Sequence, residues 1–214
     1  IKGTMTDSAR HRAEGYLAHK WGIDLPSSHT WAQGSPYEDI RNGAELTMYW
    51  GTSDGGKTEN WDQSISLGTT TSQLEVWLDA SDSSSVTHSS NAVSQWSDKS
   101  GNANHATQSA AANKPTFTAS GQNGKPVITF DGSSDYISSN GLNVSQSYSI
   151  FIVAQTNNNT SGRDYLFDGL GSNNNHRSLI ALDNSDTIQM WAYNTWANSN
   201  FSTPTDYFVL SAIF

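Results

Sequence analysis

Aromatic and amide side chains suited to sugar binding lie close together in one stretch of this sequence. Residues 187–196 read TIQMWAYNTW, and strand alternation would place Gln189, Trp191 and Tyr193 on one face. Sugar C–H faces stack on aromatic rings, while neighbouring polar groups bind the hydroxyls. The predicted glycan-binding residues are Trp191, Tyr193, Trp196, Gln189 and Asn194. Packing of Trp191 and Tyr193 against another segment or repeat is an equally favoured alternative.

Aspartates at expected strand ends and turns are the second set of residues that could do chemistry. Calcium is bound by carboxylate and carbonyl oxygens that converge on one point. The predicted metal ligands are Asp131, Asp135 and Asp168, with calcium as the ion. The sequence has no EF-hand spacing, and turn aspartates commonly bond their own backbone. The structural use is therefore favoured over calcium, and both stay open.

Histidine and cysteine chemistry is not expected. The six histidines are scattered, the H-E-x-x-H pattern is absent, and the chain contains no cysteine. These features disfavour a histidine metal site and rule out thiolate catalysis. We expect His105, within SGNANHATQ, to hydrogen-bond inside a turn.

Composition narrows the class of protein. The chain has 214 residues, a net charge of -9 and only 14% charged residues. Its acidity disfavours a nucleic-acid partner, which would normally select a basic surface. Eight Trp, eight Tyr and seven Phe argue against disorder. No apolar run approaches the length of a membrane span, so membrane insertion is not expected.

One helix is predicted, over residues 7–21. Its apolar residues fall at helical spacing, Gly22 stands where a C′ glycine belongs, and Pro26 follows. Lys20, like Arg10 and Arg12, is expected on the solvent face.

Short strands joined by Gly, Asn and Asp turns are predicted for most of the remaining chain, which favours an antiparallel β-sandwich. The expected strands are residues 45–50, 61–67, 74–78, 93–96, 116–117, 126–130, 148–155, 179–182, 188–193 and 207–214. Turn signals include Asp131-Gly132 and Asp168-Gly169.

Three motifs in order resemble a known family. LEVWLDASD, VSQWSDKSGNANHATQ and GKPVITFDGSSDY together resemble the bacterial laminin-G-like domain of the concanavalin A-like lectin/glucanase superfamily. The segment RHRAEGYLAHKWGIDLPSSH resembles the helix and tail that close such domains in exported tandem-repeat proteins. The expected organisation is therefore the end of a preceding repeat (1–30), a connector with a partial fibronectin-like hairpin (31–73), and a jelly roll incomplete at its C-terminus (74–214).

The resemblance implies a fold and a function. The fold is all-β, an antiparallel jelly-roll sandwich with one N-terminal helix from a preceding repeat. Glucanases of the superfamily carry an E-x-D-x-E strand, which this sequence lacks; Glu75 and Asp79 are expected to be structural. We therefore expect a non-catalytic, extracellular or cell-surface adhesion module that binds polysaccharide. The alternatives are a structural repeat or fibre subunit assembled by strand complementation, with other copies as partners, and an accessory domain of a glycoside hydrolase.

Overall fold

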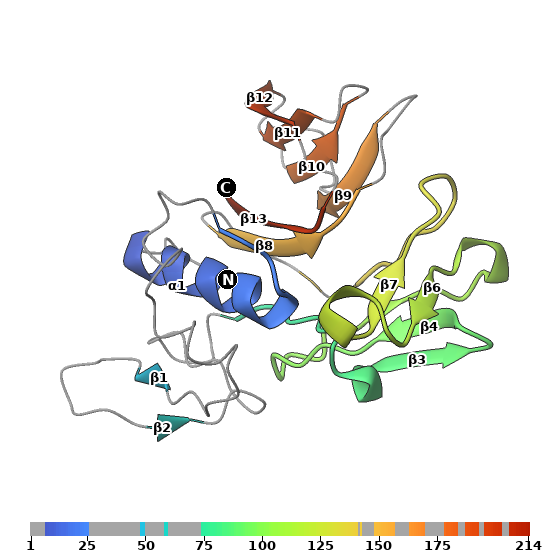
Figure 1. Cartoon of the computed structure of the whole chain (residues 1–214). Coiled ribbons are helices and arrows are strands. Elements are labelled where there is room, and N and C mark those ends of the chain that lie inside the picture. Colours follow the sequence, from blue (N-terminus) through green and yellow to red (C-terminus); the bar gives the residue numbers. More distant parts are fainter. Residues whose placement is uncertain are drawn as a thin grey trace. The chain divides into compact units, whose positions relative to one another are not determined.

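The protein is mostly β, with antiparallel sheets and a single helix among the residues that the structure describes (Figure 1). This computed structural model describes residues 7–25, 48–49, 58–59, 74–140, 142, 148–156, 163–169, 178–183, 187–192, 195–202 and 206–214. The chain divides into two compact units, one comprising residues 1–150 with Ile213 and the other residues 151–212 with Phe214. The all-β prediction is confirmed at this level.

The predicted helix is confirmed as α1, Asp7–Trp21. Its small and aromatic residues Ala13, Ala18 and Trp21 are buried, which gives the helix a packed face. Gly22 adopts a φ of +64° immediately after the helix, and Ile23 N–H donates back to the Ala18 carbonyl at 2.8 Å. The glycine is required because a left-handed residue ends the helix there.

The first unit contains a five-stranded sheet. Its main order is β3 (Val86–Ser89), β4 (Ala92–Trp96), β6 (Thr116–Thr118) and β7 (Val127–Thr129), and β5 (Ala106–Thr107) also pairs with β4. A short 3-10 helix, η2 (Ser83–Ser85), leads into β3, and two more, η3 (Ala111–Asn113) and η4 (Gln122–Gly124), lie in the connections that flank β6. Val86, Val93 and Phe117 form the buried core, and Trp96, Ile128 and Ile137 pack against it.

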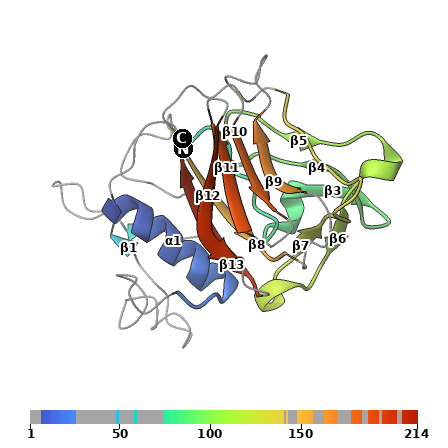
Figure 2. The same ribbon diagram turned by 90° about the horizontal axis from the view of Figure 1, so that it is seen from above.

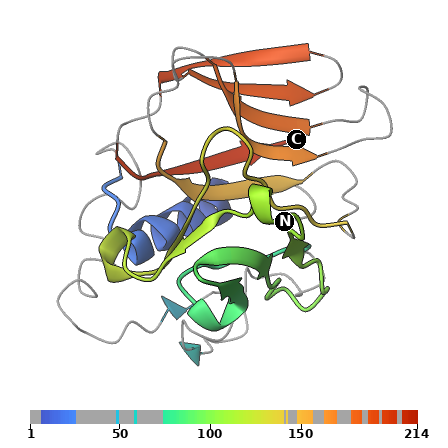
Figure 3. The same ribbon diagram turned by 90° about the vertical axis from the view of Figure 1, so that its right-hand side faces the viewer.

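The second unit contains a four-stranded antiparallel sheet. Its order is β12 (Thr195–Ser202), β11 (Thr187–Ala192), β10 (Ser178–Leu182) and β9 (Asp164–Gly169). Figures 2 and 3 show these four strands side by side in orange and red. The consecutive residues Ile180, Ala181 and Leu182 are fully buried. Successive residues of a strand point to opposite faces of the sheet. The inner strand β10 is therefore covered on both faces. A separate pair joins β8 (Ser149–Ala154) to β13 (Phe208–Ile213).

Most predicted strands of the second half are present within one or two residues. Residues 74–78 are the exception, because they belong to no sheet ladder. Side chains of residues 98–104 satisfy their backbone instead, as described below. The first strand of the hairpin predicted at 45–50 and 61–67 is represented by β1 (Met48–Tyr49), but its partner is β2 (Thr58–Glu59), which lies before the predicted second strand. Residues 61–67 lie outside the described residues.

Besides β2, four of the described strands were not predicted from the sequence: β3, β5, β9 and β12. β3 reads VTHS, in which only Val86 is apolar, so the strand lacks the apolar alternation that would reveal it. It forms because Ser90 and Asn91 adopt φ values of 48° and 68°, which create a two-residue hairpin turn into β4. Of the predicted domains, residues 1–30 as the end of a preceding repeat, 31–73 as a connector and 74–214 as a jelly roll all stay predictions.

Candidate functional site

The predicted glycan platform falls on the hairpin formed by β11 and β12. Trp191 and Trp196 are Cα partners in its antiparallel ladder, and Gln189 is opposite Asn198. Directly opposite positions of an antiparallel pair share one face of the sheet. The fold therefore brings together two positions that the sequence predicted as one site. Tyr193 and Asn194 lie outside the described residues, as do the side chains of Trp191 and Trp196.

Gln189 is the member of the predicted platform whose side chain the structure describes, and it is buried, with 6% of its surface exposed. Its amide oxygen accepts a hydrogen bond from Arg163 Nε at 2.9 Å, and its amide nitrogen donates to Asp183 Oδ2 at 3.3 Å. Asp183 Oδ1 also accepts the N–H of Thr187 at 3.0 Å. Gln189 therefore holds the start of β11 in place and does not offer a free amide at the surface.

The Asp131 loop, predicted as a calcium site, is built from hydrogen bonds within itself. Asp131 Oδ1 accepts the backbone N–H groups of Ser133, Ser134 and Asp135 at 2.8 to 2.9 Å. The N–H of Asp131 in turn donates to Asp135 Oδ2 at 3.1 Å. These backbone hydrogen bonds, led by that of Asp135, hold the pKa of the Asp131 carboxyl well below its usual range.

This arrangement does not suit a metal ligand. An oxygen that already faces three N–H donors would have to turn away from them to meet a cation. Asp168, the third predicted ligand, lies within β9 opposite Leu179, and not in the turn that was expected. Across the described residues, no three acidic or histidine side chains gather where they could hold a metal ion. The arrangement of these carboxylates therefore gives no support to a calcium site formed by Asp131, Asp135 and Asp168.

Asp98 is a buried carboxylate that organises two of the sequence motifs around itself. Its Oδ1 accepts the N–H groups of Trp77 and Ser100, each at 2.8 Å. Its Oδ2 accepts the hydroxyl of Ser100 at 2.7 Å and the N–H of Asn104 at 2.9 Å. Burial raises the pKa of Asp98, but these donors outweigh it and leave the pKa below its ordinary value.

The loop that follows Asp98 satisfies the backbone of residues 74–77. Asn102 Nδ2 donates to the Leu74 carbonyl at 2.7 Å, and Asn104 Nδ2 donates to the Glu75 carbonyl at the same distance. Lys99 N–H donates to the Trp77 carbonyl at 2.8 Å. The motif SDKSGNAN thus replaces a neighbouring strand, which explains why residues 74–78 need no ladder. His105 completes the turn, since its Nδ1 accepts the Asp98 N–H at 3.0 Å, and its predicted role is confirmed.

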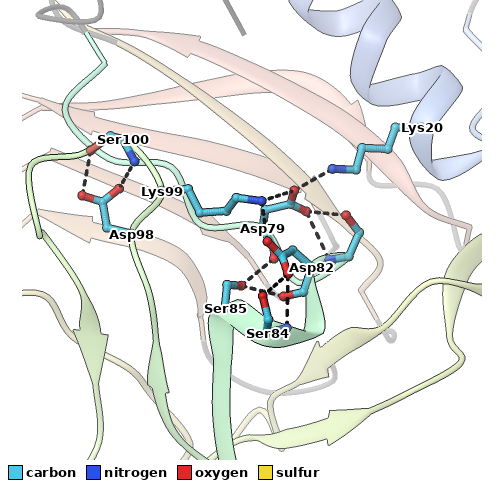
Figure 4. A network of polar contacts seen from close by, with 9 residues as sticks. Lys20, Asp79, Asp82, Ser84, Ser85, Asp98, Lys99 and Ser100 are labelled. Atoms are coloured by element: carbon cyan, nitrogen blue, oxygen red, sulfur yellow. Dashed lines mark hydrogen bonds and ion pairs between the residues drawn. The ribbon is translucent and has the colours of Figure 1, made fainter. Parts of the chain in front are cut away.

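A charged network at the end of α1 was not predicted (Figure 4). Lys20 Nζ lies 2.7 Å from Asp79 Oδ2, and the two side chains are only 16% and 7% exposed. Lys99 Nζ lies 2.7 Å from Asp82 Oδ2 and 3.8 Å from Asp79 Oδ2. The expectation that Lys20 faces solvent is therefore wrong. Helical periodicity alone left Lys20 on a polar face, and only the partner 59 positions away makes that face an internal one.

Trp77 and Trp96, which lie within two of the sequence motifs and are expected in the core for that reason, pack differently from one another. Trp96 packs against the cluster of Val86, Val93 and Phe117, so its predicted core role is confirmed. Trp77 is half-buried, and the ammonium group of Lys99 lies 4.8 Å from its ring centre.

The exposed aromatic rings that the structure describes were not predicted from the sequence. Phe130 is 43% exposed, and Tyr136 and Tyr165 are each 53% exposed. Phe130 and Tyr136 flank the Asp131 loop, and both belong to the motif GKPVITFDGSSDY, which was used only for the family resemblance. They provide matched control positions for any test of the Trp191 platform.

Two further observations bear on the class of protein. Among the described residues, no helix combines the length and apolarity needed to cross a membrane. Comparison of the chain with protein-family models, with curated proteins and with solved structures found no match.

Proposed function

We propose that the chain is a non-catalytic binding and adhesion module that recognises polysaccharide at a bacterial cell surface. In this proposal the fold is a laminin-G-like jelly roll of the concanavalin A-like type, within a larger exported protein. The three sequence motifs and the antiparallel sheets support it. The hydrogen bonds of Asp98 add to that support, because they join the first two of these motifs to each other.

The observation that carries the proposal is the register of β11 and β12. Trp191 and Trp196 are directly opposite each other in the ladder. Two aromatic positions on one face of a hairpin give the extended apolar surface on which sugar rings stack. Tyr193 and Asn194 belong to the proposed platform from the sequence alone.

Gln189 has a positioning role in this proposal. Its hydrogen bonds to Arg163 and Asp183 fix the strand that carries Trp191. A rigid strand beneath the rings lowers the entropy lost when a sugar binds. Calcium has no part in the proposed mechanism, because the carboxylate of Asp131 is already engaged by backbone donors.

The test is retention of the full chain by immobilised polysaccharides, first on a glycan array and then by affinity electrophoresis on the sugars that bind. Trp191→Ala and Trp196→Ala should each weaken binding about tenfold, equivalent to about 1.4 kcal/mol for one lost stacking contact. Tyr136→Ala removes an exposed aromatic ring from the other unit and should leave binding unchanged.

Three outcomes would count against the proposal. One is the absence of any bound polysaccharide although circular dichroism shows a folded β protein. The second is equal loss of binding in Tyr136→Ala and Trp191→Ala, which would indicate a non-specific effect of removing aromatic surface. The third is binding that a chelator abolishes, which would require a metal that the Asp131 loop does not suit.

A further inference from the structure

The pair Asn123-Gly124 lies in the turn that holds the end of α1. Asn123 Nδ2 donates to the carbonyl of Lys20 at 3.3 Å, and Gln122 Nε2 donates to the carbonyl of Trp21 at 2.8 Å. The last carbonyl groups of a helix have no partner within it and carry partial negative charge. The amides of Gln122 and Asn123 therefore supply donors that α1 itself lacks.

Asn123 is also placed for chemistry with its own backbone. Asn123 and Gly124 are exposed, and Asn123 adopts φ 50° and ψ 38° inside the three-residue helix η4. A Cβ added at Gly124 would meet no atom within 4 Å, so the space around this residue is open. Glycine has no side chain to shield its nitrogen from the amide carbon of the preceding asparagine. Of the three Asn-Gly pairs in the sequence, this is the one that the structure describes in full.

We propose that Asn123 is a deamidation site, at which an amide that caps a helix becomes an acid as the protein ages. The nitrogen of Gly124 bonds to the side-chain amide carbon of Asn123 and closes a succinimide ring. The bond from that carbon to the side-chain nitrogen breaks, and this nitrogen leaves as ammonia with the proton from Gly124. Water then opens the ring at either carbonyl, which leaves an aspartate or an isoaspartate at position 123. Neither step needs an oxidant or a reductant.

Asn102 in the loop after Asp98 provides a comparison within the same unit. Asn102 is exposed as well, but its amide donates to the Leu74 carbonyl at 2.7 Å and Ala103 follows it. The methyl group of Ala103 crowds the nitrogen that would have to attack. Asn123 has a longer hydrogen bond, 3.3 Å, and a glycine as its neighbour. We therefore expect Asn123 to react faster than Asn102.

Deamidation of Asn123 removes a donor and adds a negative charge at the C-terminal end of α1. A carboxylate cannot donate to the Lys20 carbonyl, and the partial negative charge of the last carbonyl groups repels it. Gly22 lies close to this side chain, since a Cβ there would be 3.2 Å from Asn123 Cγ. The isoaspartate product also lengthens the backbone of η4 by one carbon, so the turn must shift against Gly22. We expect the last turn of α1 to open more often.

This inference is independent of polysaccharide binding and goes beyond the proposed function. It assigns a chemical modification to η4, in the first unit, whereas the proposed glycan platform belongs to the second. The modification makes the hold on α1 depend on the age of the protein.

The first test follows the unmodified full chain in weakly alkaline buffer at physiological temperature, with circular dichroism to show that it stays folded. Fragment-ion mass spectrometry locates the small mass gain of an amide turned into an acid, and an isoaspartyl methyltransferase labels the isoaspartate product. We expect Asn123 to convert several times faster than Asn102, and Gly124→Ala to slow the conversion of Asn123 several-fold. Conversion of Asn123 no faster than that of Asn102 in the folded chain would overturn the proposal.

The second test measures the consequence with Asn123→Asp, which reproduces the aspartate product. This variant should lower the melting temperature by about 2 to 4 °C and speed amide hydrogen exchange at the end of α1, because one hydrogen bond is lost. Asn91→Asp is the matched control: Asn91 is exposed, has a φ of 68° and adds the same charge in the turn between β3 and β4. It should leave exchange in α1 unchanged. Equal exchange in the two variants would show that the Asn123 amide does not hold the helix end.

Discussion

Asp98 accepts the backbone N–H of Trp77, 21 positions earlier in the chain, at 2.8 Å. The same carboxylate binds the N–H groups of Ser100 and Asn104, so one buried side chain joins the start of the β-rich segment to the loop after β4. Its loss would leave three backbone donors without their acceptor.

We expect Asp98→Ala to lower the free energy of unfolding by about 3 kcal/mol, because charge-assisted hydrogen bonds to a buried group are lost together. Urea unfolding followed by tryptophan fluorescence would measure this change. Asp206→Ala, at an exposed position, should change stability by less than about 0.5 kcal/mol. Equal effects of the two substitutions would show that the Asp98 interactions do not stabilise the fold.

Acid should weaken the contact between Lys20, at the end of α1, and Asp79. Burial raises the pKa of Asp79, but the hydrogen bonds and charges of Lys20, Ser81 and Lys99 outweigh burial, so its pKa lies below 3.8. A carboxyl whose pKa is lower when folded than when unfolded contributes stability above its unfolded pKa. That contribution is lost as the pH falls from about 4 through the lowered pKa.

The measurement is thermal unfolding as a function of pH in the full chain and in Asp79→Asn. The native protein should lose stability more steeply below about pH 4 than the variant, which has no carboxyl to protonate at this site. Parallel pH profiles of the two proteins would mean that the charge of Asp79 does not contribute to stability.

Tyr16 should remain protonated at a pH where ordinary tyrosines ionise. Burial, followed by the negative charge of Asp79, raises the pKa of Tyr16 well above 10.0, while Lys99 opposes the shift. The unfolded chain releases this proton at lower pH than the folded protein, so stability should decline as the pH rises above about 10. Tyr16→Phe should reduce that decline, as read by unfolding at alkaline pH. In near-ultraviolet titration, the substitution should leave the ordinary tyrosine transition unchanged.

Gly121 is packed too closely for any side chain. A Cβ at this position would lie 2.5 Å from Cγ2 of Val127 in β7. We expect Gly121→Ala to destabilise the protein by about 2 kcal/mol through overpacking. Val127→Ala removes the obstructing methyl groups, so the double variant should be more stable than the sum of the single effects predicts. If calorimetry shows that the two single effects simply add, the destabilisation by Gly121→Ala does not come from contact with Val127.

The amino-acid sequence by itself determined the elements whose signals are local. α1 follows from helical spacing with a glycine at its end, and β10 and β11 follow from apolar runs bounded by turns. The Trp191 platform could be proposed because its residues are neighbours in sequence. The use of His105 in a turn was predictable for the same reason.

Tertiary structure decided every relationship between distant residues. Lys20 looked like a solvent-facing charge until folding placed Asp79 beside it, and residues 74–78 looked like a ladder strand until Asn102 and Asn104 took the place of a neighbour. Gln189 likewise became internal through Arg163 and Asp183. A polar side chain carries no local sign of its eventual partner, because burial and pairing depend on which loops the fold brings together.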